Sequence, residues 1–305
     1  MEVKLTGRFG LGFNANFEIV LECAKTMLTA KEEEEVFLDF SDVKFLYPSG
    51  INVLVAIGRY LQYQRKCSIS QNFPKDKEVC NFLDESGFSK EVGVSVPMDS
   101  NIPAHNVEYI YKMRQFTWLN NFEVEKLLDV IEKELQMSPA VRRDVHESLT
   151  ELILNVKQHS NSPFDCYIIG QGYPTTHRIR FCIADGGIGI KKHLGRKYED
   201  LLNKNSTEAI EKALIEGITG TVGNENSGLG LTYFKDFVIF CGGSFTILSG
   251  DGLYYEETDI FKQPKKYSLN FEFPGTLIDF TINSKPNIKL FRKTEEVPKE
   301  YRLIK

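Results

Sequence analysis

The sequence Ile179-Arg-Phe-Cys-Ile-Ala-Asp-Gly-Gly-Ile-Gly189 combines a strand signal with an acidic, glycine-rich turn. The apolar and β-branched residues that precede the aspartate predict a buried strand. Asp185 then begins a turn in which Gly187 and Gly189 allow backbone conformations and close contacts that a Cβ atom would prevent. No G-x-G-x-x-G helix start follows, which disfavours a dinucleotide-binding fold. Taken alone, the stretch also fits an ordinary turn between a strand and a loop.

A polar helix face lies upstream of this turn, in Glu151-Leu-Ile-Leu-Asn-Val-Lys-Gln-His159. Glu151, Asn155 and His159 are four residues apart, so a helix places them on one face. Ser138 and Pro139 suit the N-cap and first position of this helix, which we expect to run to about residue 160. A helix with this pattern alone would present a solvated polar stripe.

A second glycine box, Ser227-Gly-Leu-Gly-Leu231, lies downstream and opens a predicted helix at 229–240. Exposed N–H groups at a helix N-terminus attract phosphate, and glycines allow close contact. The chain has no G-x-x-x-x-G-K-[ST] sequence, so it is not a P-loop protein. The polar segment 190–226, with a helical centre at 207–215, has the character of a flap. Gly275-Thr276 precedes a closing strand at 276–282.

These boxes, in this order, resemble the ATP-binding boxes of the GHKL superfamily, which includes DNA gyrase, histidine kinases and the anti-sigma-factor serine kinases. The resemblance implies a Bergerat-fold α/β sandwich over residues 107–285 that binds ATP and Mg²⁺. His159 favours the serine-kinase branch.

The resemblance also implies a role for each box. Asn155 would coordinate Mg²⁺ through its amide oxygen, and Glu151 would be the general base. Asp185 would accept a hydrogen bond from the adenine amino group, and Thr276 would contact adenine through water. The remaining residues expected to contact the nucleotide are Gly187, Gly189, Ser227, Gly228, Leu229 and Gly230.

The N-terminal part alternates strand and helix signals, which predicts an α/β domain with mostly covered strands. The expected elements are strands at 3–9, 36–40 and 67–73, and helices at 17–28, 49–64 and 76–85. The stretch Phe37-Leu-Asp-Phe-Ser-Asp-Val-Lys-Phe-Leu-Tyr-Pro-Ser-Gly-Ile-Asn-Val-Leu54 resembles the core of a STAS domain, the fold of anti-sigma-factor antagonists. We therefore expect a STAS-like domain at 1–95, followed by the ATPase-like domain.

Ser49-Gly50 occupies the position at which such antagonists carry a phosphorylated serine. The residues before it are Tyr47-Pro48 rather than the usual Asp-Ser, so the site departs from the family pattern. Two interpretations of Ser49 remain open: a phosphoacceptor, or a helix N-cap.

Between the domains, prolines and the loss of periodicity predict a linker at 96–106, and residues 286–305 form a tail. The second domain should contain strands at 107–115, 167–170, 179–184, 244–249 and 276–282, with helices at 122–135, 138–160 and 229–240.

The composition excludes several classes of protein. The 305 residues carry a formal net charge of −5, so no broad basic field attracts nucleic acid or anionic membrane. No apolar run approaches the ~20 residues that span a bilayer. The six cysteines show no C-x-x-C spacing, which favours reduced thiols in a cytoplasmic protein over a zinc site or disulfide framework.

The leading hypothesis is an Mg-ATP-binding signalling protein of the anti-sigma kinase type, acting as a serine/threonine kinase or as a slow ATPase switch. The alternative is a non-catalytic, ATP-gated interaction module. A histidine kinase ranks lowest, because His146-Glu147 lies on the same predicted helix as Glu151. A protein partner, such as a STAS- or sigma-factor-like regulator, and a homodimer are expected only by resemblance, and the sequence does not identify the partner.

Overall fold

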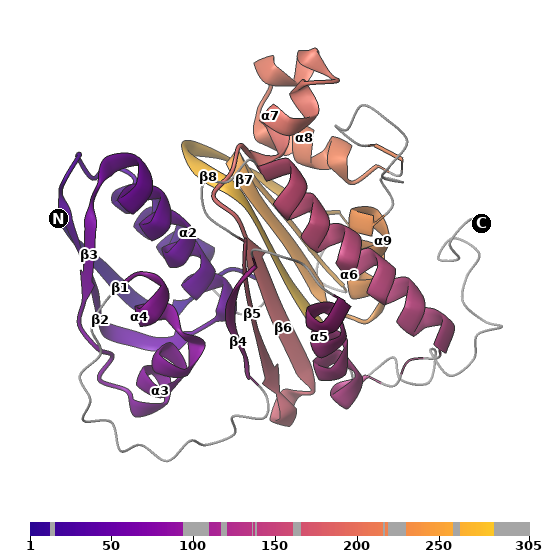
Figure 1. The fold of residues 1–305 in the computed structure, drawn as a ribbon, viewed down its shortest axis with the longest axis horizontal. Helices are drawn as coiled ribbons and strands as arrows, with labels where there is room; N and C mark the ends of the chain where they lie inside the picture. The colour runs from indigo at the N-terminus through magenta and orange to yellow at the C-terminus, as the bar shows by residue number, and fades with distance from the viewer. Residues whose placement is uncertain are drawn as a thin grey trace.

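The computed structural model describes residues 1–12, 16–93, 110–116, 121–135, 137, 139–160, 166–215, 217–218, 230–258 and 263–283. Over these ranges the chain forms a three-stranded sheet and a five-stranded sheet, with helices between and beside them (Figure 1). The mixed α/β fold class expected from the sequence is confirmed. The predicted linker at 96–106 and tail at 286–305 lie outside the described ranges.

The N-terminal sheet has the strand order β1-β2-β3, and both pairings are parallel. Parallel neighbours need crossover connections, which helices α1 and α2 provide. The elements of this part are β1 (Glu2–Phe9), α1 (Phe17–Met27), β2 (Glu35–Leu46), α2 (Pro48–Arg65), β3 (Ser68–Gln71), α3 (Lys77–Ser86) and α4 (Phe88–Glu91).

The second sheet has the order β4-β5-β6-β8-β7, and its neighbours are antiparallel. Its strands are β4 (Ile110–Phe116), β5 (Cys166–Tyr173), β6 (Arg178–Ala184), β7 (Ser244–Glu257) and β8 (Lys265–Asn283). Its α-helices are α5 (Asn121–Glu134), α6 (Pro139–Ser160), α7 (Gly189–Gly195), α8 (Ser206–Ala213) and α9 (Gly230–Phe240), with short 3₁₀ helices at Pro174–Thr176 and Glu199–Asn203.

The second sheet is covered on both faces. Successive side chains of a strand point to opposite sides, so neighbouring residues of β6 show what covers each face. On β6, Phe181 and Ile183 belong to a core shared with α5, α6 and α9. Cys182 and Ala184, which alternate with them, belong to the core of the N-terminal part.

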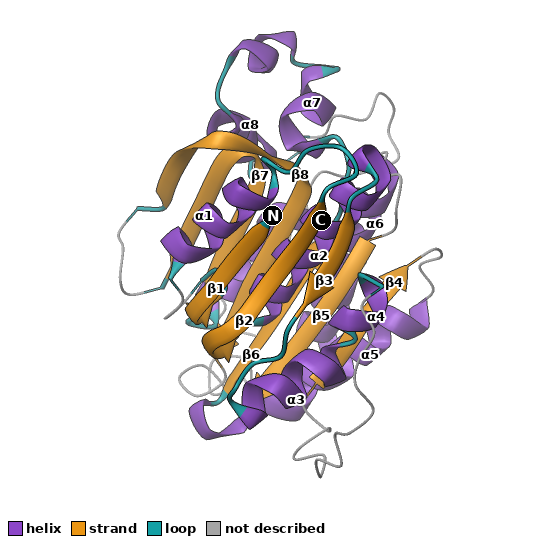
Figure 2. Cartoon of the chain, turned by 90° about the vertical axis from the view of Figure 1, so that its left-hand side faces the viewer, coloured by secondary structure: helices purple, strands orange, loops and turns teal. Residues whose placement is uncertain are grey.

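Helix α2 lies between the two sheets (Figure 2). Its residues from Pro48 to Gly58 are buried almost without interruption, as expected for a helix enclosed on several sides. It contacts β5, β6 and β8 of the second sheet and β3 of the first. The two parts of the chain therefore share one hydrophobic core across α2.

None of the helices in the described part of the chain is long and apolar enough to cross a membrane.

Candidate functional site

Asp185 stands where β6 ends, and it is buried. Its backbone N–H donates to the carbonyl of Thr276 at 2.9 Å, and its Oδ1 accepts from the N–H of Gly187 at 2.6 Å. Burial raises the pKa of Asp185 to about 7, against the hydrogen bonds from the backbone. The site thus holds a carboxyl group whose proton is easily gained or lost near neutral pH.

Glycines are sterically required around this carboxyl group. Gly275 has a φ of 88°, and a Cβ there would lie 2.6 Å from Asp185 Oδ1 and against the Asp185 carbonyl. Gly189 has a φ of 76°, and a Cβ there would lie 2.9 Å from Ser249 Oγ. Both the left-handed backbone and the close contacts require glycine. The Asp185 turn and the part of β8 around Gly275 can therefore pack together only because positions 189 and 275 are glycine.

Ser249 fixes the turn to the β7–β8 hairpin. Its Oγ donates to the carbonyl of Gly275 at 2.9 Å and accepts from the N–H of Ile190 at 3.0 Å. It also lies 3.2 Å from Thr276 Oγ1. Ser249 was not among the predicted site residues, because it ends a predicted strand and belongs to no motif.

Glu151 and Gly230 form a second contact, where α6 meets α9. Glu151 Oε2 accepts from the Gly230 N–H at 2.9 Å, so this acid caps the start of α9. Asn155 lies one turn further along α6 and is partly buried. The side chain of His159 and residues 227–229, including Ser227, Gly228 and Leu229, lie outside what the structure describes.

The structure therefore brings the predicted residues into two groups linked by α6. One group contains Asp185, Gly187, Gly189 and Thr276 at the adjoining ends of β6 and β8. The other contains Glu151 and Gly230. Helix α6 contacts α7, which begins at Gly189, as well as α9 and β8, and Figure 1 shows one end of α6 beneath α7.

Ser49 lies on the opposite face of the second sheet and is fully buried. Its Oγ accepts from the N–H of Leu11 at 2.9 Å and donates to the Leu11 carbonyl at 3.2 Å. The N-cap interpretation was wrong, because α2 begins at Pro48 and Tyr47 occupies the N-cap.

Asp279 of strand β8 lies next to the Ser49 hydroxyl. Burial raises the pKa of Asp279 to about 7, against the charge of Arg180 and the hydroxyl of Ser49. Its neighbours Ile278 and Phe280 belong to the core with α6 and α9, so Asp279 and Ser49 face away from those helices.

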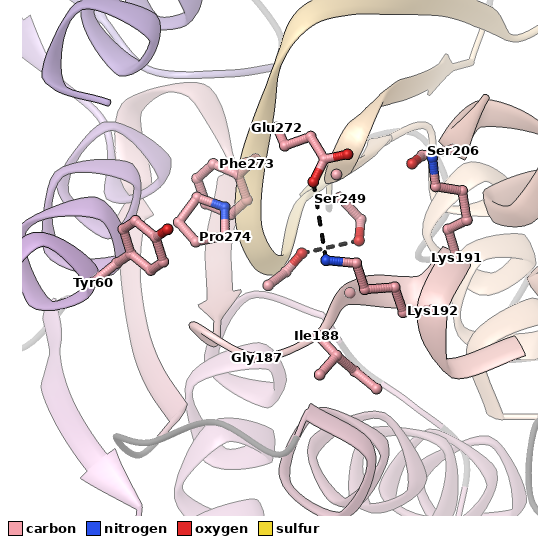
Figure 3. A pocket seen from close by; sticks show the side chains of 13 residues that line it. Tyr60, Gly187, Ile188, Lys191, Lys192, Ser206, Ser249, Glu272, Phe273 and Pro274 are labelled. Carbon is pink, nitrogen blue, oxygen red and sulfur yellow. Dashed lines mark hydrogen bonds and ion pairs between the residues drawn. The ribbon is translucent and has the colours of Figure 1, made fainter. Parts of the chain in front are cut away.

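A cavity of about 140 Å³ lies beside the Gly187–Gly189 turn (Figure 3). Tyr60 of α2, Lys191 and Lys192 of α7, and the segment 272–275 of β8 line it. Both lysines already have acidic neighbours, since Lys191 Nζ lies 3.3 Å from Asp251 and Lys192 Nζ lies 4.0 Å from Glu272.

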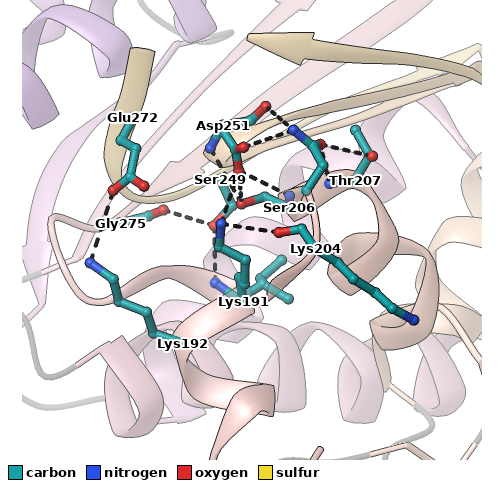
Figure 4. Close-up of polar contacts among 11 residues, drawn as sticks. Lys191, Lys192, Lys204, Ser206, Thr207, Ser249, Asp251, Glu272 and Gly275 are labelled. Atoms are coloured by element: carbon teal, nitrogen blue, oxygen red, sulfur yellow. Dashed lines mark hydrogen bonds and ion pairs between the residues drawn. The ribbon is translucent and has the colours of Figure 1, made fainter. Parts of the chain in front are cut away.

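Asp251 also anchors the start of α8 (Figure 4). It accepts from the Ser206 N–H at 2.9 Å and from Asn205 Nδ2 at 2.7 Å. Through Asp251, these contacts hold α7 and α8 against strand β7, next to the Gly187–Gly189 turn.

No protein-family model matches the chain, and no curated protein matches it in sequence. Within the described ranges, no group of three or more His, Cys, Asp or Glu side chains is placed to hold a metal ion.

Proposed function

We propose that the chain binds ATP between the Asp185 turn and helix α6. The observation that carries this proposal is the buried carboxyl group of Asp185, held by the Gly187 N–H and enclosed by glycine-only contacts from Gly275. A fixed carboxylate accepts a hydrogen bond from the amino group of adenine. Guanine presents a carbonyl oxygen at the equivalent ring position, which a carboxylate repels, so this arrangement favours ATP over GTP.

The residues present also suit Mg²⁺. In proteins this ion keeps several waters and is held by one or two side-chain oxygens together with substrate phosphates. The amide oxygen of Asn155, one turn from Glu151, supplies such a ligand without a cluster of acids. When bound, the ion would neutralise charge on the phosphates. The Gly230 N–H donates to Glu151, so the N–H groups of α9 that follow Gly230 would be the ones offered to the phosphates.

For the chemistry, we propose a signalling enzyme of the anti-sigma kinase type, which transfers phosphate to a serine or threonine of a partner, or slowly to water. Glu151 would take the proton from the attacking hydroxyl or water. Ser49 of the same chain is a poor acceptor in this arrangement, because it is buried on the far face of the sheet.

A second candidate function is a non-catalytic, ATP-gated interaction module. One observation favours it: the Glu151 carboxylate is engaged by the Gly230 N–H, so its position serves the packing of α9 on α6. In this reading, ATP changes the position of α9 and the flap without being consumed.

The experiment follows protein-bound label and free phosphate after incubation of the purified chain with Mg²⁺ and γ-labelled ATP. Asn155→Ala serves as the control, because it removes the proposed ion ligand. Either product, absent from the control, supports the enzyme. ATP binding with neither product overturns the slow ATPase and is the result expected of the gated module or of a kinase that needs its partner. Absence of ATP binding overturns both.

We place the protein in the cytoplasm, since its six cysteines are free thiols.

A further inference from the structure

Asn52 is a polar residue in the buried N-terminal half of α2. It is the one polar residue in the stretch 51–57 of α2, and it is 0% exposed. A buried amide costs free energy unless its polar atoms find partners. The contacts of Asn52 therefore indicate what the amide does at this position.

The amide group of Asn52 reaches across to the second sheet. Its Nδ2 donates to the carbonyl of Cys182 in β6 at 2.8 Å and to the carbonyl of Tyr167 in β5 at 3.2 Å. One side chain of the N-terminal part thus bridges two neighbouring strands of the other part. Its Oδ1, by contrast, is buried without a hydrogen-bond partner.

These two carbonyls are close to the proposed nucleotide site along the strands. Tyr167 pairs with Ala184, the last residue of β6, and Asp185 follows directly. Ala184 also pairs with Leu277, which follows Thr276. The strand end that carries Asp185 is therefore fixed from the α2 side by Asn52 and along its edge by β8.

We propose that Asn52 is a positioning residue of the nucleotide site: it fixes the register of α2 on the sheet and holds the end of β6 so that Asp185 is placed for adenine. A single buried amide can set register between packed elements at some cost in stability. The inference rests on the proposed ATP site. It makes docking of the N-terminal part and ATP binding mutually favourable, because such coupling is reciprocal.

The variant Asn52→Leu separates positioning from stability. Leucine has nearly the same size and removes the unpartnered Oδ1, but it also takes the Nδ2 donor from the Tyr167 and Cys182 carbonyls, so the melting temperature should fall modestly, and ATP affinity is measured well below it. ATP affinity should fall by about tenfold, within the usual range for coupled sites, and the preference for ATP over GTP should shrink. The control is Tyr63→Leu on the same helix, since Tyr63 is 63% exposed and should change neither quantity.

Hydrogen exchange of the wild-type chain tests the same coupling without a variant. Saturating Mg-ATP should slow amide exchange around residues 185–190 and also around Asn52 in α2. Two results together would overturn this inference while the proposed function stands. ATP would slow amide exchange in the 185–190 turn but not in α2, and Asn52→Leu would bind ATP as tightly as wild type. A wild-type chain that binds no ATP overturns the proposed function, and this inference with it.

Discussion

The carboxylate of Glu151 and the backbone N–H of Gly230 form a hydrogen bond of 2.9 Å that joins the middle of α6 to the first residue of α9. A Cβ at position 230 would lie 2.6 Å from the Cβ of Glu151, so the two helices meet at this point only because residue 230 is glycine. A negative group at a helix N-terminus is favourable. The acid proposed for catalysis thus has a structural role that can be measured separately.

Replacing Glu151 should separate these two roles. Glu151→Ala removes the cap and should lower the free energy of unfolding by about 1 kcal/mol, whereas Glu151→Gln keeps an acceptor and should lose less. If Glu151 is also the base, Glu151→Gln should stop phosphate release and leave ATP binding intact. Urea unfolding and phosphate release measure the two effects. An alanine variant as stable as wild type would show that the cap contributes nothing.

Gly275→Ala should be more damaging than its backbone conformation alone explains. Gly275 has a φ of 88° and Gly87 has a φ of 84°, but an added Cβ meets Asp185 only at position 275 and meets nothing within 4 Å at position 87. Gly87→Ala should therefore cost about 1 kcal/mol of strain, while Gly275→Ala should cost roughly 3 kcal/mol and weaken ATP binding. Urea unfolding of both variants makes the comparison, and equal losses would contradict the steric argument.

The longer helices could be predicted from sequence because their signals are local, whereas the short helices α4 and α7 were not predicted. Helix α3 has Asp76 as its N-cap and Gly87 in the left-handed conformation after its last residue, both of which leave a mark in the sequence. Strands β7 and β8 run longer than predicted. Gly250, Gly252 and Gly275 resemble turn signals, yet the hairpin continues past them through register shifts.

Much of the candidate site was also predictable, as separate boxes along the chain. The contacts that assemble it were not, because they join residues distant in sequence. Asn52 and Cys182 are 130 positions apart, and Ile190 and Ser249 are 59 apart. A polar residue in a helix and a serine at a strand end carry no local mark of such partners.

Thiol reactivity should distinguish one cysteine from the other five. Cys80 is partly exposed, and the remaining cysteines are buried. Burial raises the pKa of Cys23 to about 12, and it raises the pKa of Cys182 and Cys241 as well. Burial and Asp84 raise the pKa of Cys80 as well, so access to the sulfur is what distinguishes it: an aromatic disulfide reagent at pH 7.5 should label this one thiol in a separate, faster phase. Cys80→Ser should remove that phase, and a second fast thiol in this variant would contradict the burial pattern.

ATP affinity should rise with pH through about 7 and then level off, because the carboxylate form of Asp185 is the one that accepts from adenine. The free energy of unfolding should change with pH in the opposite direction. The folded pKa of about 7 exceeds the ordinary value of 3.8, so the folded state holds an extra proton between these values and loses stability as pH rises across that window.

Asp185→Asn should remove the pH dependence of ATP binding and flatten part of the stability slope, leaving the part due to Asp279, whose pKa is also raised to about 7. Titrations with ATP and urea at pH 5 to 8 test both. An unchanged pH profile in the variant would show that another group controls binding.

Substitutions at Ser49 should report on packing rather than on phosphate transfer. Ser49→Ala leaves the Leu11 N–H and carbonyl without their shared partner and should cost about 1–3 kcal/mol of stability. Ser49→Asp should be far more destabilising, because it places a second carboxylate close to the buried Asp279. Since Ser49 faces away from α6 and α9, wild type and Ser49→Ala should carry equal label after incubation with γ-labelled ATP. Label that disappears in a stably folded Ser49→Ala would instead require the N-terminal part to leave the sheet and present Ser49 to an ATP site.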